Sequence, residues 1–356
     1  MLNINIDEKA VKKITLNDIK HTQYNVVQGN NLIEAMYDLN ERELKVFLAI
    51  ISLIGKNDNA LNWYKLTTKE LCTLCGIPER NGKRTLNTLR EGLMSKVFYM
   101  RQTVEENGSI KDVIIEYHFF RAVMFNDDFW YVRLSDDLIP FVLCLKDNFT
   151  TEKLSDVRNY NCSLAIRLDM IFTMRYKKET SKMSLENKLN YKMTVVYDLN
   201  VFRDMIMLDG KYQEFKMFNN KILKPAIDAV NEKKYFHVDM KKELNVKHQV
   251  SKIVFFVTLG ERHEYYQTVS EKLAEKQQDT QMKEKITKIL VAIGFSNKDI
   301  EYILKKNEIE TITTQLLKLN DLDIDEKEDQ KEYLCANLKT KQQDGIAVSA
   351  MIAALK

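Results

Sequence analysis

The stretch DGKYQEFKMFNNKILKPAIDAVNEKKYFHVD, from Asp209 to Asp239, contains in succession the signals of a turn, a long helix and a strand. DGKY predicts the turn, and QEFKMFNNKILKPAIDAVNEK predicts the helix. At 3.6 residues per turn, one face of this helix is apolar and must be buried. Its members are Phe215, Phe218, Ile222, Ala226 and Val230, with Leu223 and Ile227 beside them.

The opposite face of the helix is basic and amide-bearing, with no acidic residue between Phe215 and Ile227. Lysines neutralise phosphates, and amides form paired hydrogen bonds with adenine edges in the major groove of DNA. We therefore predict a DNA-reading helix; the alternative is an ordinary solvated face. Asn219 falls nearer the core face, where we expect it to satisfy a backbone group. The outward residues are Gln213, Met217, Asn220, Lys221 and Lys224, with Lys216 at the edge.

The segments around this helix complete a winged helix. YDLNVFRDMIML predicts a short preceding helix, with Asp198 or Asn200 as its N-cap. YFHVDMKK and VSKIVFFVTL predict two strands around the polar tip ELNVKHQ. A helix-turn-helix followed by such a hairpin is typical of DNA-binding proteins. Four further residues of the turn and the tip join the predicted DNA-binding set: Lys211, Tyr212, Lys247 and His248. For His248, a plain solvent position is an equal alternative.

The same order of elements occurs earlier in the chain. NLIEAMYDLNERELKVFLAIISLIG has helical spacing and splits at Asn40, a plausible N-cap. Thr67 or Thr68 then caps a short helix that Gly76 ends, and a second helix runs from about Gly82 to Leu93. Leu86, Leu89 and Leu93 face inward. The Asn107–Gly108 pair predicts the hairpin that serves as the wing.

The second helix of this earlier unit also carries basic and amide residues. Because Arg84, Asn87 and Arg90 lie at three-residue spacing, they share one side of the helix. The signal is weaker than in the later unit, so we expect phosphate contact rather than base reading. The predicted set is Arg80, Lys83, Arg84, Asn87 and Arg90.

These patterns predict an α+β fold, mainly helical, with two winged helices in tandem and a helical C-terminal region. NYNCSLAIRLDMIFTMRYKK is expected to close the first unit as an amphipathic helix, and residues 283–319 to form two short helices broken at Gly294–Asn297. The expected parts are an arm (1–24), a first winged-helix domain for dimerisation and backbone contact (25–179), a linker (180–190), a second winged-helix domain for sequence-specific binding (191–264) and a partly acidic helical region (265–356).

Composition sets bounds on the class of protein. The 356 residues are 45% hydrophobic and 29% charged, a normal globular balance. No apolar run approaches the ~20 residues of a membrane helix, and the N-terminus lacks the apolar segment of a signal peptide. Five scattered cysteines fit a reducing cytoplasm. Charge is uneven: residues 1–264 sum to about +5 and residues 265–356 to about −2.

Several catalytic signatures are missing. GIPERNGKRT has five residues between Gly76 and Gly82, where a phosphate-binding loop needs four. Cys72 and Cys75 are spaced like half a zinc site, but no second pair follows. A nicking enzyme needs a histidine pair near a tyrosine, and the histidines are isolated. We therefore expect a non-enzymatic protein with no metal or cofactor. The histidines are His21, His118, His237, His248 and His263.

The sequence resembles the Rep_3 family of plasmid replication initiators, which bind repeated origin sequences (iterons) with two winged helices. The resemblance is sharpest at LDGKYQEFKMFNNKILKPAIDAVNEK followed by VSKIVFFV, which is similar to the family's second-domain pattern. NNLIEAMYDLNERELKVFLAII and NFTTEKLSDVRNYNCSLAIRL resemble its first domain. The Tyr-Ser-x-Arg-Leu-Tyr string of that domain is matched loosely around Arg167. The resemblance covers roughly residues 25–260.

This resemblance implies partners and activities that composition does not show. Such proteins bind double-stranded origin DNA at direct repeats, help to open the duplex and repress their own synthesis at an operator. They interconvert between monomer and homodimer, and we expect contacts with the host replicative helicase and initiator. The alternative is a double winged-helix transcriptional regulator. A nicking enzyme is a third hypothesis, which the missing histidine pair disfavours.

Overall fold

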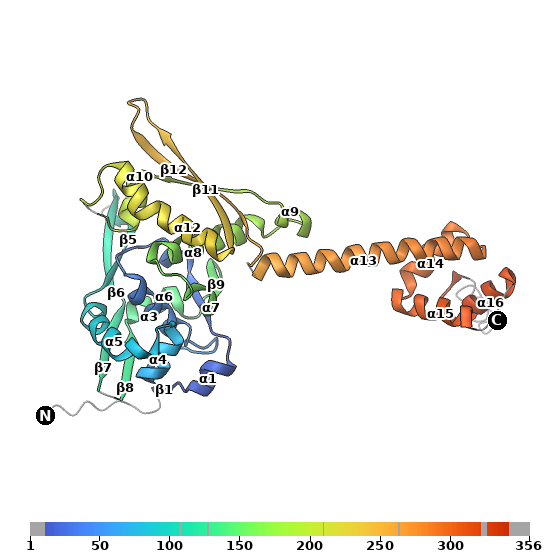
Figure 1. Ribbon diagram of the computed structural model, residues 1–356, viewed down its shortest axis with the longest axis horizontal. Helices are drawn as coiled ribbons and strands as arrows, with labels where there is room; N and C mark the ends of the chain where they lie inside the picture. The colour runs from blue at the N-terminus through green and yellow to red at the C-terminus, as the bar shows by residue number, and fades with distance from the viewer. Residues whose placement is uncertain are drawn as a thin grey trace. The chain divides into compact units, whose positions relative to one another are not determined.

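The computed structural model describes residues 11–106, 109–126, 128–208, 210–262, 264–321 and 326–341. The hairpin tip Asn107–Gly108, the first turn residue Asp209, His263 and the apolar end IAVSAMIAAL lie outside these residues. The chain divides into two compact units, residues 1–267 and 268–356, each described here by itself (Figure 1). The fold is α+β and mainly helical, as predicted. Among the described residues, no helix is both long and apolar enough to cross a membrane.

The first winged helix begins with helix α3 (Glu41–Ile51), which Asn40 caps as predicted by accepting hydrogen bonds from two backbone N–H groups. Strand β4 (Trp63–Thr67) leads to helix α4 (Thr68–Cys75), capped by Thr67 and ended by Gly76 with a φ of 69°. Helix α5 (Glu79–Leu93) begins three residues before the predicted start at Gly82. Pro78 favours the earlier start, because its φ of −59° suits a helix and proline has no backbone N–H that would need a partner at the helix start.

The prediction for the first wing was wrong. Strand β4 pairs with β8 (Phe129–Leu134), which pairs with β7 (Phe120–Phe125), so β7 and β8 form the wing. The hairpin at Asn107–Gly108 exists as β5 (Val97–Glu106) and β6 (Ser109–His118), but it pairs with β3 (Met36–Tyr37) in a separate sheet. A local turn signal identifies a hairpin without identifying its distant partner strand. The β5–β6 hairpin is therefore an insertion between helix α5 and the wing.

Two further N-terminal expectations need correction. The predicted arm contains strand β1 (Val11–Lys13), parallel to β4, and helix α1 (Leu16–His21). The helix expected from Asn31 shortens to α2 (Asn30–Ile33) before strand β3. The carbonyls of Ala35 and Tyr37 accept hydrogen bonds from Arg167 at 2.6 and 3.2 Å, so they are not available to continue the helix. Strand β2 (Asn25–Gly29) pairs with β9 (Phe149–Lys153).

Helix α8 (Ser163–Thr180) was predicted to be amphipathic, but 13 of its 18 residues are buried. It packs against α3 of the first winged helix and against helix α12 (Lys224–Lys233) of the second. Arg167 donates to carbonyls of both: Ala35 and Tyr37 in the first, and Met205 in the second at 2.8 Å. One continuous hydrophobic core therefore runs through both winged helices. Three short helices complete this part: α6 (Ile139–Val142), α7 (Leu154–Val157) and α9 (Leu185–Leu189), the last within the predicted linker.

The second winged helix repeats the strand order of the first. Strand β10 (Met193–Asp198) pairs with β12 (Val250–Leu259), which pairs with β11 (Phe236–Leu244), as β4 pairs with β8 and β8 with β7. The sequence reading predicted β11 and β12 but missed β10. Helix α10 (Leu199–Met205) begins at Asp198, which caps it as predicted.

The C-terminal unit has its own small core of aliphatic residues and Phe295. Helix α13 (Glu264–Ile293) supplies Ile286 and Leu290 to it, and Gly294, with a φ of 103°, ends this helix at the predicted break. Helices α14 (Asn297–Lys306), α15 (Ile309–Asp321) and α16 (Lys327–Asn337) follow. Two short helices were expected over 283–319, but Asn307 adds a second break, where its amide donates to the carbonyls of Ile303 and Lys339.

Candidate nucleic-acid interface

The recognition helix of the second winged helix has three parts instead of the one continuous helix predicted. Helix α11 (Phe215–Phe218) passes into a π-helical turn (Asn219–Leu223) and then into α12. Pro225 accounts for the wider turn, because proline lacks an N–H and its ring clashes with the carbonyl four residues before it in a regular helix. The π-helical turn shifts the buried face of the helix by one residue. Phe218 and Leu223 are both 0% exposed, whereas Ile222 is only half-buried.

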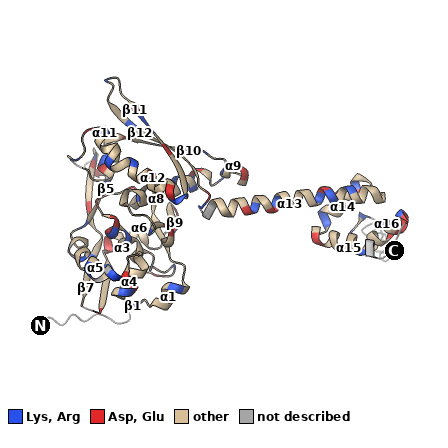
Figure 2. Cartoon of the chain, in the orientation of Figure 1, with Lys and Arg blue, Asp and Glu red and all other residues tan. Residues whose placement is uncertain are grey.

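The outward side of this helix carries the residues that the sequence analysis placed there. Lys216, Asn220, Lys221 and Lys224 are all exposed, and Met217 is 46% exposed beside them. Gln213, which was predicted in the helix, is exposed in the turn before it. Figure 2 shows basic residues on this helix and along the neighbouring wing. Three lysines therefore share the exposed side of the helix with an amide and a thioether. Lysine suits phosphate contact, an amide suits an adenine edge, and an apolar side chain suits the methyl group of thymine.

Two residues of the helix differ from the expectation. The amide of Asn219 donates to the side chain of Asn220 at 3.4 Å, and its carbonyl oxygen has no hydrogen-bond partner among the described residues. Asn219 was predicted to hydrogen-bond a backbone group, but its described hydrogen bond goes to the side chain of Asn220. Lys224 forms an ion pair with Asp228 at 2.8 Å, one turn further on and just past the acid-free stretch. This pairing reduces the charge that Lys224 presents to solvent.

The turn and the wing lie on either side of the recognition helix in sequence. Lys211, Tyr212 and Gln213 are exposed, and Tyr212 adopts a φ of 52°. At the wing tip, Lys247 and His248 are also exposed, and His248 has a φ of 58°. Asn245 holds this tip by accepting hydrogen bonds from the backbone N–H groups of residues 247 and 249.

Sequence reasoning missed Lys242 on wing strand β11. Its ammonium nitrogen lies 5.8 Å from the ring centroid of Phe215, at the start of the recognition helix. Val238, Met240 and Lys242 alternate along the strand, so they share the face that packs towards this helix. Lys242 is the exposed, outermost member of that series. The alternation was visible in YFHVDMKK, and extending it by one step identifies this lysine.

The first winged helix presents a smaller set of polar groups. Arg80, Arg84 and Asn87 are exposed on or near α5. Arg90 is half-buried, and its guanidinium carbon lies 4.0 Å from the ring centroid of Phe125, on wing strand β7. The side chain of Lys83 lies outside the described residues. Arg90 is thus positioned by the wing, whereas its neighbours extend into solvent.

Titratable groups in the interior lie away from these surfaces. Burial raises the pKa of the Cys72 thiol to about 11, helped by the nearby Glu79, and burial raises the pKa of Cys75 further. These values suit packed thiols rather than zinc ligands. Glu152 of β9 and Asp169 of α8 form a buried acidic pair. Burial raises the pKa of Asp169 to about 7, and burial together with the charge of Asp169 raises the pKa of Glu152. Among the described residues, no group of acids, histidines and cysteines could hold a metal ion.

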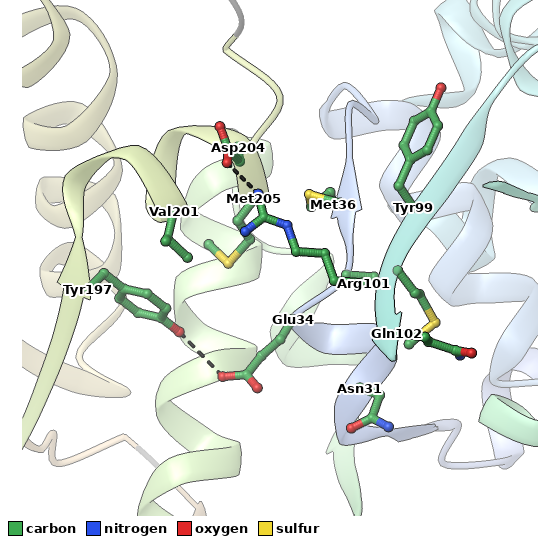
Figure 3. Close-up of a pocket in the computed structure, with 12 residues that line it drawn as sticks. Asn31, Glu34, Met36, Tyr99, Arg101, Gln102, Tyr197, Val201, Asp204 and Met205 are labelled. Carbon is green, nitrogen blue, oxygen red and sulfur yellow. Dashed lines mark hydrogen bonds and ion pairs between the residues drawn. The ribbon is translucent and has the colours of Figure 1, made fainter. Parts of the chain in front are cut away.

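A cavity of about 420 Å³ lies between the inserted hairpin and the second winged helix (Figure 3). Arg101 of β5 crosses it to bond Asp204 of α10 at 2.5 Å. On the other side, the hydroxyl of Tyr197 donates to Glu34 at 3.5 Å, and Glu34 also accepts from Arg175 at 2.5 Å. Opposite charges are thus paired around the cavity, which ties the two winged helices together.

Comparisons with known proteins match this architecture. Residues 25–173 match the model of the initiator replication protein WH1 domain, and residues 198–257 match that of the initiator Rep protein WH2 domain. A replication initiation protein of Escherichia coli is 23% identical over 210 residues, which cover 58% of this chain and 61% of that protein. The match thus spans about three fifths of that relative's length.

Two solved structures show lower similarity. One is the Pi initiator protein in complex with iteron DNA, 15% identical, covering 66% of this chain and 98% of that chain with a TM-score of 0.49. The other is RctB domains 2–3, 12% identical, covering 61% of this chain and 81% of that chain with a TM-score of 0.34. The two domain matches, on top of the repeated winged-helix topology, decide the family: the chain belongs to the initiator replication proteins with WH1 and WH2 domains.

Proposed function

We propose that this chain initiates plasmid replication by binding repeated origin DNA through its second winged helix. One observation carries the proposal: a recognition helix seated on a deep core presents Asn220 outward among Lys216, Lys221 and Lys224. Base contacts give specificity and phosphate contacts give position, and this surface offers both. Lys242 and the wing tip extend it on one side.

The first winged helix takes a supporting role in this proposal. Arg80, Arg84 and Asn87 contact the phosphate backbone of a neighbouring stretch of the same duplex, with Arg90 held by the wing beside them. Membership of the family supports a homodimer in equilibrium with the monomer, and binding to an operator of the chain's own gene. The host replicative helicase and initiator are the proposed protein partners, in the cytoplasm where plasmid DNA resides.

The proposed activity is binding without bond cleavage. Neither the nucleotide-binding loop nor the histidine pair of a nicking enzyme is present in the sequence. DNA opening then draws on binding energy alone, because the contacts made by the protein compensate for lost base pairing. Purified protein is expected to bind duplex DNA without metal or nucleotide and to leave both strands intact. Metal-dependent nicking of supercoiled origin DNA, abolished by a substitution in this chain, would contradict this.

The test of the proposal is plasmid maintenance. The gene and its flanking DNA are placed in a vector that lacks an origin, and transformants are counted in the native host. Stable replication that depends on the flanking repeats and is lost with Asn220→Ala is the expected result. Absence of replication, with intact binding to a single palindrome beside the gene, would instead identify a transcriptional regulator.

A further inference from the structure

The segment between α10 and the recognition helix has an unusual backbone. Met207, Gly210 and Tyr212 adopt φ values of 50°, 70° and 52°. Only glycine takes this left-handed region freely, so Met207 and Tyr212 add conformational cost. The N–H of Leu208 donates to the carbonyl of Arg203 at 3.1 Å, and the N–H of Lys211 donates to the carbonyl of Leu208 at 3.0 Å. These bonds hold the early part of the turn and leave the carbonyls of Tyr212 and Gln213 to other partners.

Arg203 supplies those partners. One terminal nitrogen of its guanidinium donates to the carbonyl of Tyr212 at 2.7 Å and to that of Gln213 at 3.0 Å. The guanidinium carbon also lies 4.9 Å from the ring centroid of Phe218, the first fully buried residue of the recognition helix. A single side chain therefore ties the end of α10 to both the turn and the helix that follows it.

We propose that Arg203 is a positioning residue for DNA recognition, which sets the angle at which the recognition helix leaves the turn. This inference rests on the proposed function. Gln213 carries one of the carbonyls that Arg203 holds, and Lys216 and Asn220 lie three and seven residues further along the chain, so a rotation of the turn displaces these side chains from the base edges. Random DNA requires only the lysine charges, which tolerate such a displacement.

The chemistry requires arginine rather than a positive charge alone. A planar guanidinium lies over an aromatic ring while it donates in its own plane to two carbonyls. A lysine ammonium at the same position keeps the charge but lacks the planar group that lies over the ring of Phe218 and aims its N–H bonds in one plane. The Arg203→Lys variant therefore separates positioning from charge, and Arg203→Met also removes the charge but retains the apolar stem.

Asp204, the next residue, provides a matched control. It lies on the same helix, but its carboxylate bonds Arg101 on strand β5 rather than the turn. Asp204→Asn therefore weakens an ion pair of α10 with the other winged helix without touching the carbonyls of Tyr212 and Gln213.

The experiment uses the full chain. The wild-type protein first selects a preferred duplex from a randomised pool, and binding to this duplex and to a scrambled one is then titrated for wild type and the three variants, with thermal melts alongside. Arg203→Lys and Arg203→Met are expected to lose about tenfold or more on the selected duplex, equivalent to one lost base contact. On scrambled DNA, Arg203→Lys is expected to change less than about twofold, because charge governs that binding. Asp204→Asn is expected to keep the wild-type ratio of the two affinities.

Three results would overturn the inference. The first is an Arg203→Lys variant that keeps the wild-type ratio of the two affinities, because the planar guanidinium would then be unnecessary. The second is an equal loss on both duplexes that parallels a lower melting temperature, which would indicate general destabilisation. If Arg203→Met fails to fold, Arg203→Lys decides between these outcomes. The third is a wild-type protein that selects no duplex, and it would overturn the proposed function as well.

Discussion

The two winged helices share one strand order and differ in how the recognition helix is seated and what it presents. Helix α5 is regular, and two glycines bring it close to its neighbours: a Cβ at Gly82 would lie 2.5 Å from the sulfur of Cys72, and one at Gly92 would lie 2.5 Å from a carboxylate oxygen of Glu43. The later recognition helix contains a π-helical turn and packs through Phe218 and Leu223. The same topology thus supports two surfaces with separate chemistry.

The difference teaches that two units with the same strand order can present different side chains on the same helix. On α5, the described polar groups are mainly arginines, and Arg90 packs on the ring of its own wing. On the later helix, an amide stands among lysines that extend into solvent. Arginines and lysines on phosphates position a protein, whereas an amide on a base edge discriminates between sequences. We therefore propose that the second winged helix reads sequence.

The largest expected effect tests how the recognition helix of the second winged helix packs on its core. Phe218→Ala should destabilise the protein by about 3–5 kcal/mol, because it removes a fully buried ring that packs on Phe202, Phe215 and Arg203. The measurement is the free energy of unfolding in urea. The exposed neighbour provides the control, since Met217→Ala should stay within about 0.5 kcal/mol of wild type. Equal costs for the two variants would place the ring outside the core.

The next largest effect concerns the buried acidic pair formed by Asp169 of α8 and Glu152 of β9. The carboxyl of Asp169 has a folded-state pKa of about 7, well above its ordinary value, and that of Glu152 is raised in the same direction. The folded state then binds more protons than the unfolded state, so the stability gained from these groups is present below about pH 4 and is lost as pH rises through about 7. The expected change is on the order of a few kcal/mol.

This pH dependence is measured by urea unfolding between pH 5 and 8. Asp169→Asn should flatten the profile, because the amide does not ionise. Thr180→Val, at the end of the same helix, is the control and should keep the slope, because the hydroxyl of Thr180 bonds the carbonyl of Tyr176 rather than either acid. A slope that survives in both Asp169→Asn and Glu152→Gln would assign the titration to other groups.

Much of the helical framework could be predicted from single residues, because caps are local. Asn40, Thr67, Gly76 and Asp198 all end or begin helices as expected. The wing of the first unit could not be predicted, since two hairpins follow α5 and only long-range pairing with β4 decides between them. Helix α8 was mistaken for amphipathic because its two buried sides face two different domains.

The reading surface shows a similar limit. Helical periodicity correctly predicted that the outward side chains between Gln213 and Lys224 are exposed. The π-helical turn shifts the buried face by one residue, so Leu223 is fully buried and Ile222 is only half-buried. Pro225 is the sequence signal of that turn. Lys242 was overlooked because the sequence reading treated the wing as a tip with two strands and did not extend the strand alternation towards the helix.

A smaller effect compares the two asparagines. Asn220→Ala should cost about 1–3 kcal/mol on the selected duplex and flatten the preference at one base pair. Asn87→Ala on α5 should weaken binding without changing the preference at any position, because we assign it to phosphate contact. Titrations on duplexes with single base-pair changes distinguish the two. A position-specific loss for Asn87→Ala would place base reading in the first winged helix.

The smallest effect concerns individual lysines. Lys221→Ala should weaken specific and random binding about equally and lower the dependence of affinity on salt by roughly one unit. Lys224→Ala should lower it by less than Lys221→Ala, because Asp228 already pairs with Lys224. The measurement is affinity at several salt concentrations. A larger change in salt dependence for Lys224→Ala than for Lys221→Ala would show that Asp228 releases Lys224 on binding.

The central claim, that the second winged helix reads sequence and the first holds the backbone, is tested most directly by repeating the selection from a randomised pool with variant proteins. One variant is Asn220→Ala, and the other combines Arg84→Ala with Asn87→Ala. The account predicts that the double variant selects the wild-type consensus with lower affinity, whereas Asn220→Ala selects a consensus that has lost its preference at one base pair. An altered consensus for the double variant, with the wild-type consensus retained by Asn220→Ala, would contradict it.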